Sequence, residues 1–369
     1  MKVNANTKMM PVPLGKLAGL PVYKPGKSAE ATMVEHGLTH AAKLSSNENP
    51  FGPLPSVVDA IVRAAADINR YSDTGATELR RTLAEFVGVP VEMIATTPGS
   101  SGVLIQSLNA FAGPGDEVAF NWRSFEAYPI FSRSVGATDV HAPLRDNELD
   151  LEALAGIVGE RTKVVLIANP NNPTGTVCSE GQLRAFLNAI PSTVLVVLDE
   201  AYTEFIDEGA TVDGVDLLPE FPNLVVSRTM SKAYGLAGLR VGYAIAHPDL
   251  ITAIDKVAAP FAIPGVSQAA AIAALQPAAQ AELVERVALI RSERARVVDA
   301  VCALGFDVPV SQANLIWLPV GQRAIEIGLV LEHHGVVSRV FADDGVRITI
   351  GSPIENDMVI AALAGIATG

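Results

Sequence analysis

The sequence predicts an α/β fold built on a mostly parallel sheet that helices cover on both faces. Two short apolar runs, residues 163–167 and 192–198, are typical of buried strands. They alternate with helical stretches, a pattern of strand–helix–strand units whose strands are parallel. A chain of 369 residues is too long for one small core, so we expect a large and a smaller domain.

The domain order follows from shifts in composition along the chain. Residues 1–40 are rich in Pro, Gly and Lys, and we expect an arm that joins the small domain or a dimer contact. Residues 41–264 form the predicted large domain, which would carry the ligand site. The pattern then shifts to helices followed by strand-like residues 314–319 and 346–350, so we expect the small domain to be 265–369.

The segment 231–240 sets Lys232 among small hydroxyl and glycine residues and places Arg240 eight positions later. A lysine amine can bond covalently to the aldehyde of pyridoxal phosphate, while hydroxyls and a guanidinium hold the phosphate. Lys232 is therefore the predicted catalytic residue, with Thr229, Ser231 and Arg240 as phosphate ligands. Taken alone, the segment is equally typical of a Gly-rich loop with a solvated lysine.

The run at 192–198 ends in Asp199, and Tyr202 lies three residues further on. Pyridoxal phosphate withdraws electrons only while its pyridine nitrogen stays protonated, and a buried carboxylate beside that nitrogen keeps the proton there. Asp199 is the candidate for this role, and Tyr202 for a hydrogen bond to the phenolic oxygen. A helix N-cap would explain Asp199 equally well if the motif stood alone.

The run at 163–167 leads into residues 168–175, where two prolines, a glycine and three asparagines indicate a rigid turn. We expect this turn to present the Asn172 amide to the phenolic oxygen from the side opposite Tyr202. A plain strand-to-helix loop explains the prolines and the glycine, but not the whole octet in this order.

These motifs, in this order and followed by residues 346–351, resemble the fold-type I aminotransferases of the histidinol-phosphate branch, in the class-II family that depends on pyridoxal phosphate. The resemblance implies a large domain with a mostly parallel seven-stranded sheet between helices, plus a smaller α/β domain. Within that branch, residues 16–27, 121–129 and 311–319 most resemble the bacterial aromatic (phenylalanine) aminotransferases.

The resemblance assigns further residues to the large-domain side of the site. Asn47 lies in the family's Asn-Glu-Asn-Pro loop near the substrate. Ser100 and Ser101 occupy the phosphate loop ahead of an apolar helical stretch, where N–H groups suit an anion. Many relatives carry an acid in this loop and this chain does not. Phe125 falls where the family stacks an aromatic ring on the pyridine face.

The remaining residues that the resemblance assigns concern the substrate and a second subunit. Arg347 would bind the substrate's α-carboxylate through two parallel hydrogen bonds, with Arg339 as a weaker second candidate. Tyr71 matches a tyrosine that reaches the partner subunit's cofactor phosphate, which implies a homodimer with shared active sites. The family's proline after this tyrosine is Ser72 here. Tyr23 would contribute aromatic surface to the substrate pocket.

The predicted reaction is ping-pong transamination between an aromatic amino acid (phenylalanine, tyrosine or tryptophan) and a 2-oxo acid such as 2-oxoglutarate. Tyr23, Trp122, Phe125 and Phe261 supply surface for a phenyl or indole side chain. Histidinol phosphate, the alternative substrate, would require a second anion site, and the sequence has no obvious added basic cluster for one.

Three functions other than transamination are alternatives for this chain. Decarboxylation of amino acids on the same scaffold stays open, because no linear motif reveals which bond of the α-carbon is broken. A DNA-binding regulator with an aminotransferase-like domain is disfavoured, since residues 1–40 are too short and Pro-rich for a DNA-binding module. A nicotinamide dehydrogenase is disfavoured because no Gly-x-Gly-x-x-Gly follows a strand.

Composition limits the partners and the compartment. The formal net charge of −13 disfavours nucleic acid and anionic membranes. Cys178 and Cys302 are too few for a disulfide framework and fit a reducing cytoplasm. No apolar run approaches the ~20 residues of a membrane span, and the N-terminus lacks the apolar core of a signal peptide. No metal site is predicted, because the adjacent His333 and His334 are typical of a helix end.

Overall fold

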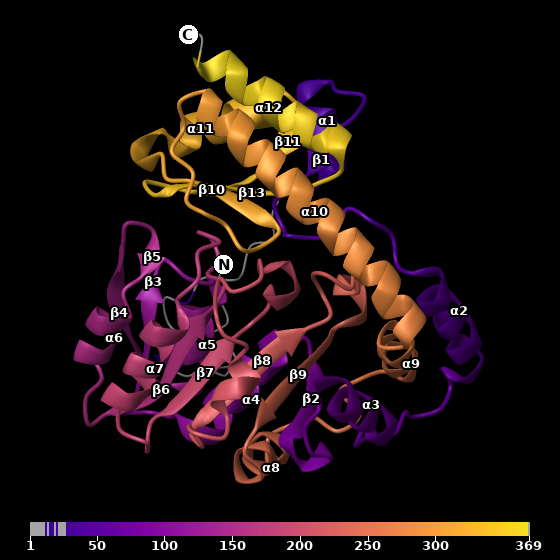
Figure 1. Ribbon diagram of the computed structural model, residues 1–369, viewed down its shortest axis with the longest axis vertical. Helices are drawn as coiled ribbons and strands as arrows, with labels where there is room; N and C mark the ends of the chain where they lie inside the picture. The colour runs from indigo at the N-terminus through magenta and orange to yellow at the C-terminus, as the bar shows by residue number, and fades with distance from the viewer. Residues whose placement is uncertain (1–11, 13–14, 18–19, 21–26, 368–369) are drawn as a thin grey trace, which may run out of the picture.

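The computed structural model describes residues 12, 15–17, 20 and 27–367, and a twisted sheet forms the centre of the larger lobe (Figure 1). In spatial order the sheet consists of β2 (Ile94–Pro98), β9 (Val241–Ala246), β8 (Leu224–Thr229), β7 (Leu195–Asp199), β6 (Thr162–Ala168), β3 (Glu117–Trp122), β4 (Thr138–Arg145) and β5 (Glu148–Leu149).

Most neighbours in this sheet are parallel, as predicted. The exceptions are β9, which runs antiparallel to both β2 and β8, and the two-residue β5, which pairs with β4. β5 is added to the seven longer strands at the edge of the sheet. The apolar runs of the sequence correspond to β6 and β7, but β7 begins only at Leu195, because residues 191–194 form a turn closed by Val194 N–H and Pro191 O.

Helices cover both faces of the sheet, and alternate residues of the strands supply the two cores. Val164, Leu166, Leu195 and Val197 face one core, and Val165, Ile167, Val196 and Leu198 face the other. The first face is covered by α4 (Ser100–Phe111), α5 (Ala127–Val135) and α8 (Pro248–Lys256). The second is covered by α3 (Thr77–Val87), α6 (Leu151–Gly156), α7 (Glu180–Ala189) and α9 (Gly265–Ala274), with α2 (Pro55–Ala64) packed on α9.

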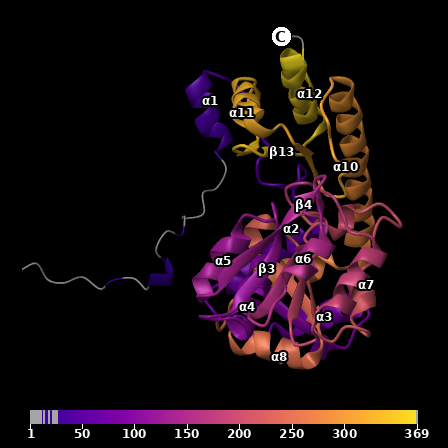
Figure 2. The same cartoon turned by 90° about the vertical axis from the view of Figure 1, so that its left-hand side faces the viewer.

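The smaller lobe lies above the carboxyl ends of the parallel strands (Figures 1 and 2). Its sheet has the order β10 (Leu315–Leu318), β13 (Gly345–Thr349) and β12 (Arg339–Phe341), all antiparallel. Its helices are α1 (Ala29–His36), α11 (Ala324–His333), α12 (Pro353–Ala367) and the upper part of α10 (Pro277–Ala303). Figure 1 shows α10 running from this lobe down to α9. Short 3-10 turns span Gly15–Leu17, Ala65–Asp67, Val91–Met93, Thr203–Phe205, Gly214–Leu217, Ala237–Leu239 and Gly321–Arg323.

Two contacts link parts of the chain that the sequence assigned to different domains. β1 (Ala42–Lys43) pairs in parallel with β11 (Val336–Val337) of the smaller lobe, and α9 packs against α2 and α3 of the larger one. Both contacts run between the predicted large domain and the predicted small domain, and the domain boundaries at residues 41 and 265 stay predictions. Within the described residues, every helix is too short or too polar to span a bilayer.

Candidate active site

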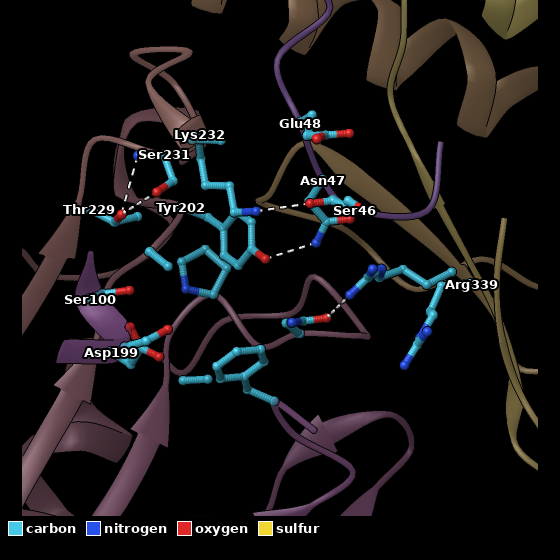
Figure 3. Close-up of a pocket in the computed structure, with 18 of the residues that line it drawn as sticks. Ser46, Asn47, Glu48, Ser100, Asp199, Tyr202, Thr229, Ser231, Lys232 and Arg339 are labelled. Carbon is cyan, nitrogen blue, oxygen red and sulfur yellow. Dashed lines mark hydrogen bonds between the residues drawn. The ribbon is translucent and has the colours of Figure 1, made fainter. Parts of the chain in front are cut away.

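A cavity of about 310 Å³ opens between the two lobes, and Figure 3 shows the side chains that surround it. Its lining combines the predicted site residues with several that were not predicted: Ser45, Ser46, Asn47, Glu48, Ser100, Ser101, Phe125, Ala168, Pro170, Asn172, Asp199, Ala201, Tyr202, Thr229, Ser231, Lys232, Ala237, Arg240, Arg339 and Arg347.

The topology explains why these distant residues meet. Asp199 and Thr229 are the last residues of β7 and β8, and Asn172 lies in the turn that follows β6. Because the carboxyl ends of adjacent parallel strands lie at one edge of the sheet, their loops share one crevice. Arg339 and Arg347 come from the smaller lobe, where they are paired across β12 and β13.

Hydroxyl groups and one guanidinium converge at the β8 end of the cavity. Thr229 Oγ1 donates to Ser231 Oγ at 3.0 Å, and Arg240 Nη1 donates to the same oxygen at 3.3 Å. Ser100 and Ser101 begin α4, whose first backbone N–H groups have no partner within the helix. Donors from a helix N-terminus and a guanidinium form a site for a phosphate group.

This end of the cavity depends on close contact between two backbone segments. Gly242 on β9 lies against Gly99 and Ser100, and a Cβ atom at residue 242 would overlap their backbone atoms. Gly99 has a φ of 72° and lies so close to the Arg240 guanidinium that a side chain there would displace it. Two glycines therefore allow the start of α4 to approach β9 and Arg240.

Asp199 is a buried residue of the cavity lining and lies near Ser100 in Figure 3. The Tyr128 hydroxyl donates to its Oδ2 at 3.0 Å, whereas its Oδ1 is buried without a hydrogen-bond partner among the described residues. Burial raises the pKa of Asp199 to about 7, and the Tyr128 hydrogen bond and the charge of Lys232 oppose that rise. An unsatisfied carboxylate oxygen beside a cavity is suited to a cationic N–H donor of a ligand.

The Lys232 amine lies in the cavity lining and donates to the Ser46 carbonyl at 3.0 Å (Figure 3). Burial, followed by the positive charge of Arg347, lowers the pKa of Lys232 to about 7. A substantial fraction of the amine is therefore neutral near pH 7, as nucleophilic attack and proton transfer both require.

Asn47 holds Tyr202 in place. Asn47 has a φ of 52°, and its Nδ2 donates to the Tyr202 hydroxyl at 2.8 Å. Thr349 on β13 fixes Asn47 from behind, because it accepts from Asn47 N at 2.9 Å and its Oγ1 donates to Asn47 Oδ1 at 3.1 Å. The Asn47 amide therefore fixes the position of the Tyr202 hydroxyl in the cavity lining.

Arg347 and Asn172 form a second oriented pair. Arg347 Nη1 donates to Asn172 Oδ1 at 2.6 Å, and Nη2 donates to the Ser45 carbonyl. With its oxygen engaged, the Asn172 amide has its two N–H donors left for other partners. The neighbouring Arg339 makes two hydrogen bonds of 3.0 Å with the Glu126 carboxylate.

The structure brings the predicted site residues into this one cavity, except Tyr71 and Tyr23. Tyr71 is 85% exposed and stacks on Phe261 at 4.6 Å between ring centroids, away from the cavity lining. Tyr23 lies outside the described residues. Phe125 lines the cavity, whereas Trp122 and Phe261, expected to supply pocket surface, do not.

The sequence did not indicate three residues that complete this arrangement. Ser46 acts through a backbone carbonyl, which has no sequence signal. Thr349 lies two residues after Arg347 on the same strand, so its position on the same face as Arg347 could have been read from strand alternation. Tyr128 lies three residues after Phe125, within the segment 121–129, and no motif of the sequence marks its hydroxyl for a role in the site.

The residues fit pyridoxal phosphate at each of its functional groups. Lys232 would bond to the aldehyde carbon, and Arg240, Ser231 and the start of α4 would hold the phosphate. The orphaned Asp199 Oδ1 fits the protonated ring nitrogen, since a buried acceptor without a donor is costly unless a ligand satisfies it.

Comparison with known proteins agrees with this geometry. Residues 39–363 match the family model described as aminotransferase class I and II, and the chain belongs to this family, whose members depend on pyridoxal phosphate. It is 49% identical to an aromatic amino acid aminotransferase of Streptomyces coelicolor over 94% of each chain. It is also 49% identical to the aromatic amino acid aminotransferase of Thermobifida fusca, over 92% of this chain and 93% of that protein.

A solved structure extends the similarity to three dimensions. The histidinol-phosphate aminotransferase of Sinorhizobium meliloti, in complex with pyridoxal-5'-phosphate, superimposes with a TM-score of 0.86 at 31% sequence identity, covering 99% of both chains. The fold is therefore the fold-type I aminotransferase fold, and the enzyme is a transaminase that acts on an amino acid and an oxo acid.

Proposed function

We propose that this transaminase exchanges the amino group between aromatic amino acids and a 2-oxo acid such as 2-oxoglutarate in a ping-pong reaction. The single observation that carries the catalytic assignment is the Lys232 amine and the orphaned Asp199 Oδ1 in one cavity. The substrate assignment rests on the similarity to the two aromatic amino acid aminotransferases.

Bound pyridoxal phosphate supplies an electron-withdrawing ring that stabilises negative charge developing at the substrate's α-carbon. Lys232 would be the base that takes the proton from the substrate's α-carbon and delivers it to the cofactor's C4' carbon, and its lowered pKa suits both accepting and donating that proton. Asp199 would hold the ring nitrogen's proton through Oδ1. Tyr202 and Asn172 would hold the phenolic oxygen, and Asn47 and Arg347 orient these two side chains.

Arg347 binds the substrate α-carboxylate in this proposal. It is buried, and its hydrogen bonds to Asn172 and Ser45 fix the plane of the guanidinium before a substrate arrives. A fixed planar guanidinium binds a carboxylate through two parallel hydrogen bonds at little entropic cost.

An uncharged side chain suits the region around Arg339 better than a phosphate does. The Glu126 carboxylate already meets the Arg339 charge with two hydrogen bonds, and a phosphate bound there would compete with it. Phe125 adds aromatic surface to the lining. Histidinol phosphate is the second candidate substrate, because the Sinorhizobium meliloti structure carries that name.

The test is an absorbance titration of the holoenzyme with phenylalanine and, separately, histidinol phosphate. Conversion of the cofactor band by phenylalanine alone supports the aromatic assignment, and conversion by histidinol phosphate alone overturns it. Release of carbon dioxide in place of an amino–oxo exchange would indicate a decarboxylase.

We also propose a homodimer in which Tyr71 of each subunit reaches the phosphate end of the other's site. Support comes from the exposed apolar side chains of Phe261, which stacks on Tyr71, and of Val62 and Ile68, which precede Tyr71 in the sequence. Mixing Lys232→Ala subunits with Tyr71→Ala subunits tests this sharing. A heterodimer would combine both defects in one site and leave the other intact, so activity should reappear on mixing; no recovery in a verified heterodimer would contradict the model.

The cytoplasmic location is a further part of the proposal. Cys178 and Cys302 are both free thiols, and Cys302 is exposed, which suits a reducing compartment. Fractionation of cells that produce the natural protein would test the assignment.

A further inference from the structure

Tyr128 connects two groups of the site without lining the cavity itself. It lies in the first turn of α5, where its backbone N–H donates to Phe125 O at 2.9 Å. Its ring is fully buried and makes edge contacts with Phe120 at 5.5 Å and Phe125 at 5.7 Å between centroids. The start of α5 therefore places a buried hydroxyl that reaches Asp199 three residues after Phe125.

The hydroxyl makes the two oxygens of Asp199 different. Oδ2 accepts from Tyr128 at 3.0 Å, and Oδ1 has no partner among the described residues although it is equally buried. With Oδ2 held, rotation of the carboxylate about its terminal bond would break a buried hydrogen bond, which is unfavourable. The titratable groups that act on Asp199 are Tyr128, Glu200 and Lys232.

We infer that Tyr128 is a positioning residue for Asp199: its hydroxyl fixes Oδ2, directs Oδ1 toward the cofactor's ring nitrogen and favours the ionised carboxylate. The inference rests on the proposed role of Asp199 and adds a residue to it. A carboxylate oxygen accepts a hydrogen bond more strongly than an oxygen of the protonated acid does. The hydrogen bond from Tyr128 therefore favours the charged form of Asp199 over the neutral form.

A purely structural role for Tyr128 makes a different prediction. If the ring only fills the core, removal of the hydroxyl leaves the packing intact and changes neither the acidity of Asp199 nor cofactor binding. Tyr128→Phe is therefore the informative variant, since it keeps the ring contacts with Phe120 and Phe125. Tyr243→Phe is the matched control, because Tyr243 is also a buried tyrosine but interacts with Arg228 instead of Asp199.

The first readout is the pKa of Asp199 in cofactor-free protein, measured by carbon NMR of labelled aspartate carboxyl groups and assigned with Asp199→Asn. We expect Tyr128→Phe to raise that pKa by about one unit, the loss expected for a hydrogen bond to a charged acceptor. The second readout is the affinity for pyridoxal phosphate at pH 8, which should weaken about tenfold. Tyr243→Phe should change neither quantity.

Two outcomes separate the inference from the proposed function. If Asp199→Asn loses turnover while Tyr128→Phe keeps the wild-type Asp199 pKa and cofactor affinity, the role of Tyr128 is overturned and that of Asp199 stands. If Asp199→Asn keeps wild-type turnover, the roles of both residues fail. Should Tyr128→Phe not fold, difluorotyrosine at position 128 replaces it: a stronger donor of the same shape should lower the Asp199 pKa, and an unchanged pKa overturns the inference.

Discussion

Two adjacent acids, Asp199 and Glu200, face opposite sides of the sheet and differ in how completely they are satisfied. Glu200 Oε2 accepts from Arg228 Nε at 2.9 Å and Nη2 at 2.8 Å, and its Oε1 accepts from Gly214 N at 2.8 Å. Asp199 has one hydrogen bond and one orphaned oxygen. Alternation along the strand sends the first acid to the cavity and the second to the core side.

The difference distinguishes a functional carboxylate from a structural one. On the core side, every Glu200 oxygen has a protein partner, so the ion pair stabilises the fold and offers nothing to a ligand. On the cavity side, the cost of burying Asp199 stays uncompensated until a donor binds. We therefore expect substitutions on the cavity side to affect turnover and those on the core side to affect stability.

The largest effect should come from Asp199→Asn. An amide cannot keep a proton on the ring nitrogen, so turnover should fall by about a thousandfold. The melting temperature of the cofactor-free protein should stay close to that of the wild type, because no ion pair is lost. Steady-state kinetics measures the turnover and thermal unfolding measures the melting temperature. If Asp199→Asn kept wild-type turnover, or lost much of its stability, the distinction between a functional Asp199 and a structural Glu200 would be wrong.

Arg228→Met should have the reverse profile. It leaves Glu200 buried without its cation, which should lower the free energy of unfolding by about 3 kcal/mol while turnover per folded molecule changes little. Denaturant unfolding measures the loss. The double variant with Glu200→Gln should recover part of it, since no uncompensated charge remains; a double variant as unstable as the sum of both singles would contradict the ion-pair explanation.

Lys232→Met tests the cavity side through pH. The folded-state pKa of Lys232 is about 7 and its ordinary value 10.5, so between these values the unfolded chain binds the extra proton. The free energy of unfolding should therefore rise with pH across that range in cofactor-free wild type. The variant should lack this rise, and its free energy of unfolding at pH 7 should exceed that of the wild type by about 2 kcal/mol. This gain is smaller than the whole pKa shift would imply, because the lysine is partly exposed and solvent screens its charge. If the free energy of unfolding changed with pH in the same way in the wild type and in Lys232→Met, the lowered pKa of Lys232 would be contradicted.

The smallest effect belongs to Glu204, on the core side. Burial raises its pKa to about 7, and its Oε2 has no hydrogen-bond partner among the described residues. The folded chain keeps this proton up to about pH 7 whereas the unfolded chain loses it near 4.5, so stability falls as pH rises between these values. Glu204→Gln should remove that fall and stabilise the protein at pH 8 by about 1 kcal/mol in denaturant unfolding.

The sequence was most informative where one residue type is required by chemistry. Lys232, Asp199 and Arg240 lie in short motifs at the ends of strands, so the sheet topology brings them together once the strands are located. Residues that act through position left weaker traces. Ser46 contributes only a carbonyl, and Thr349 and Tyr128 contribute hydroxyls that reach the site through other side chains. Pairing between β1 and β11 is non-local, and no local pattern specified it.

The contact of Gly242 with Gly99 and Ser100 has a consequence for attempts to redesign this enzyme. Even alanine at position 242 would push the start of α4 away from β9, so a mutant library that randomises this position would consist almost entirely of proteins with a distorted anion site. Selection for new substrates should instead vary the side of the cavity near Glu126 and Arg339, which lies apart from that backbone contact. Substrate preference can then change while the anion site at the start of α4 and Arg240 stays the same.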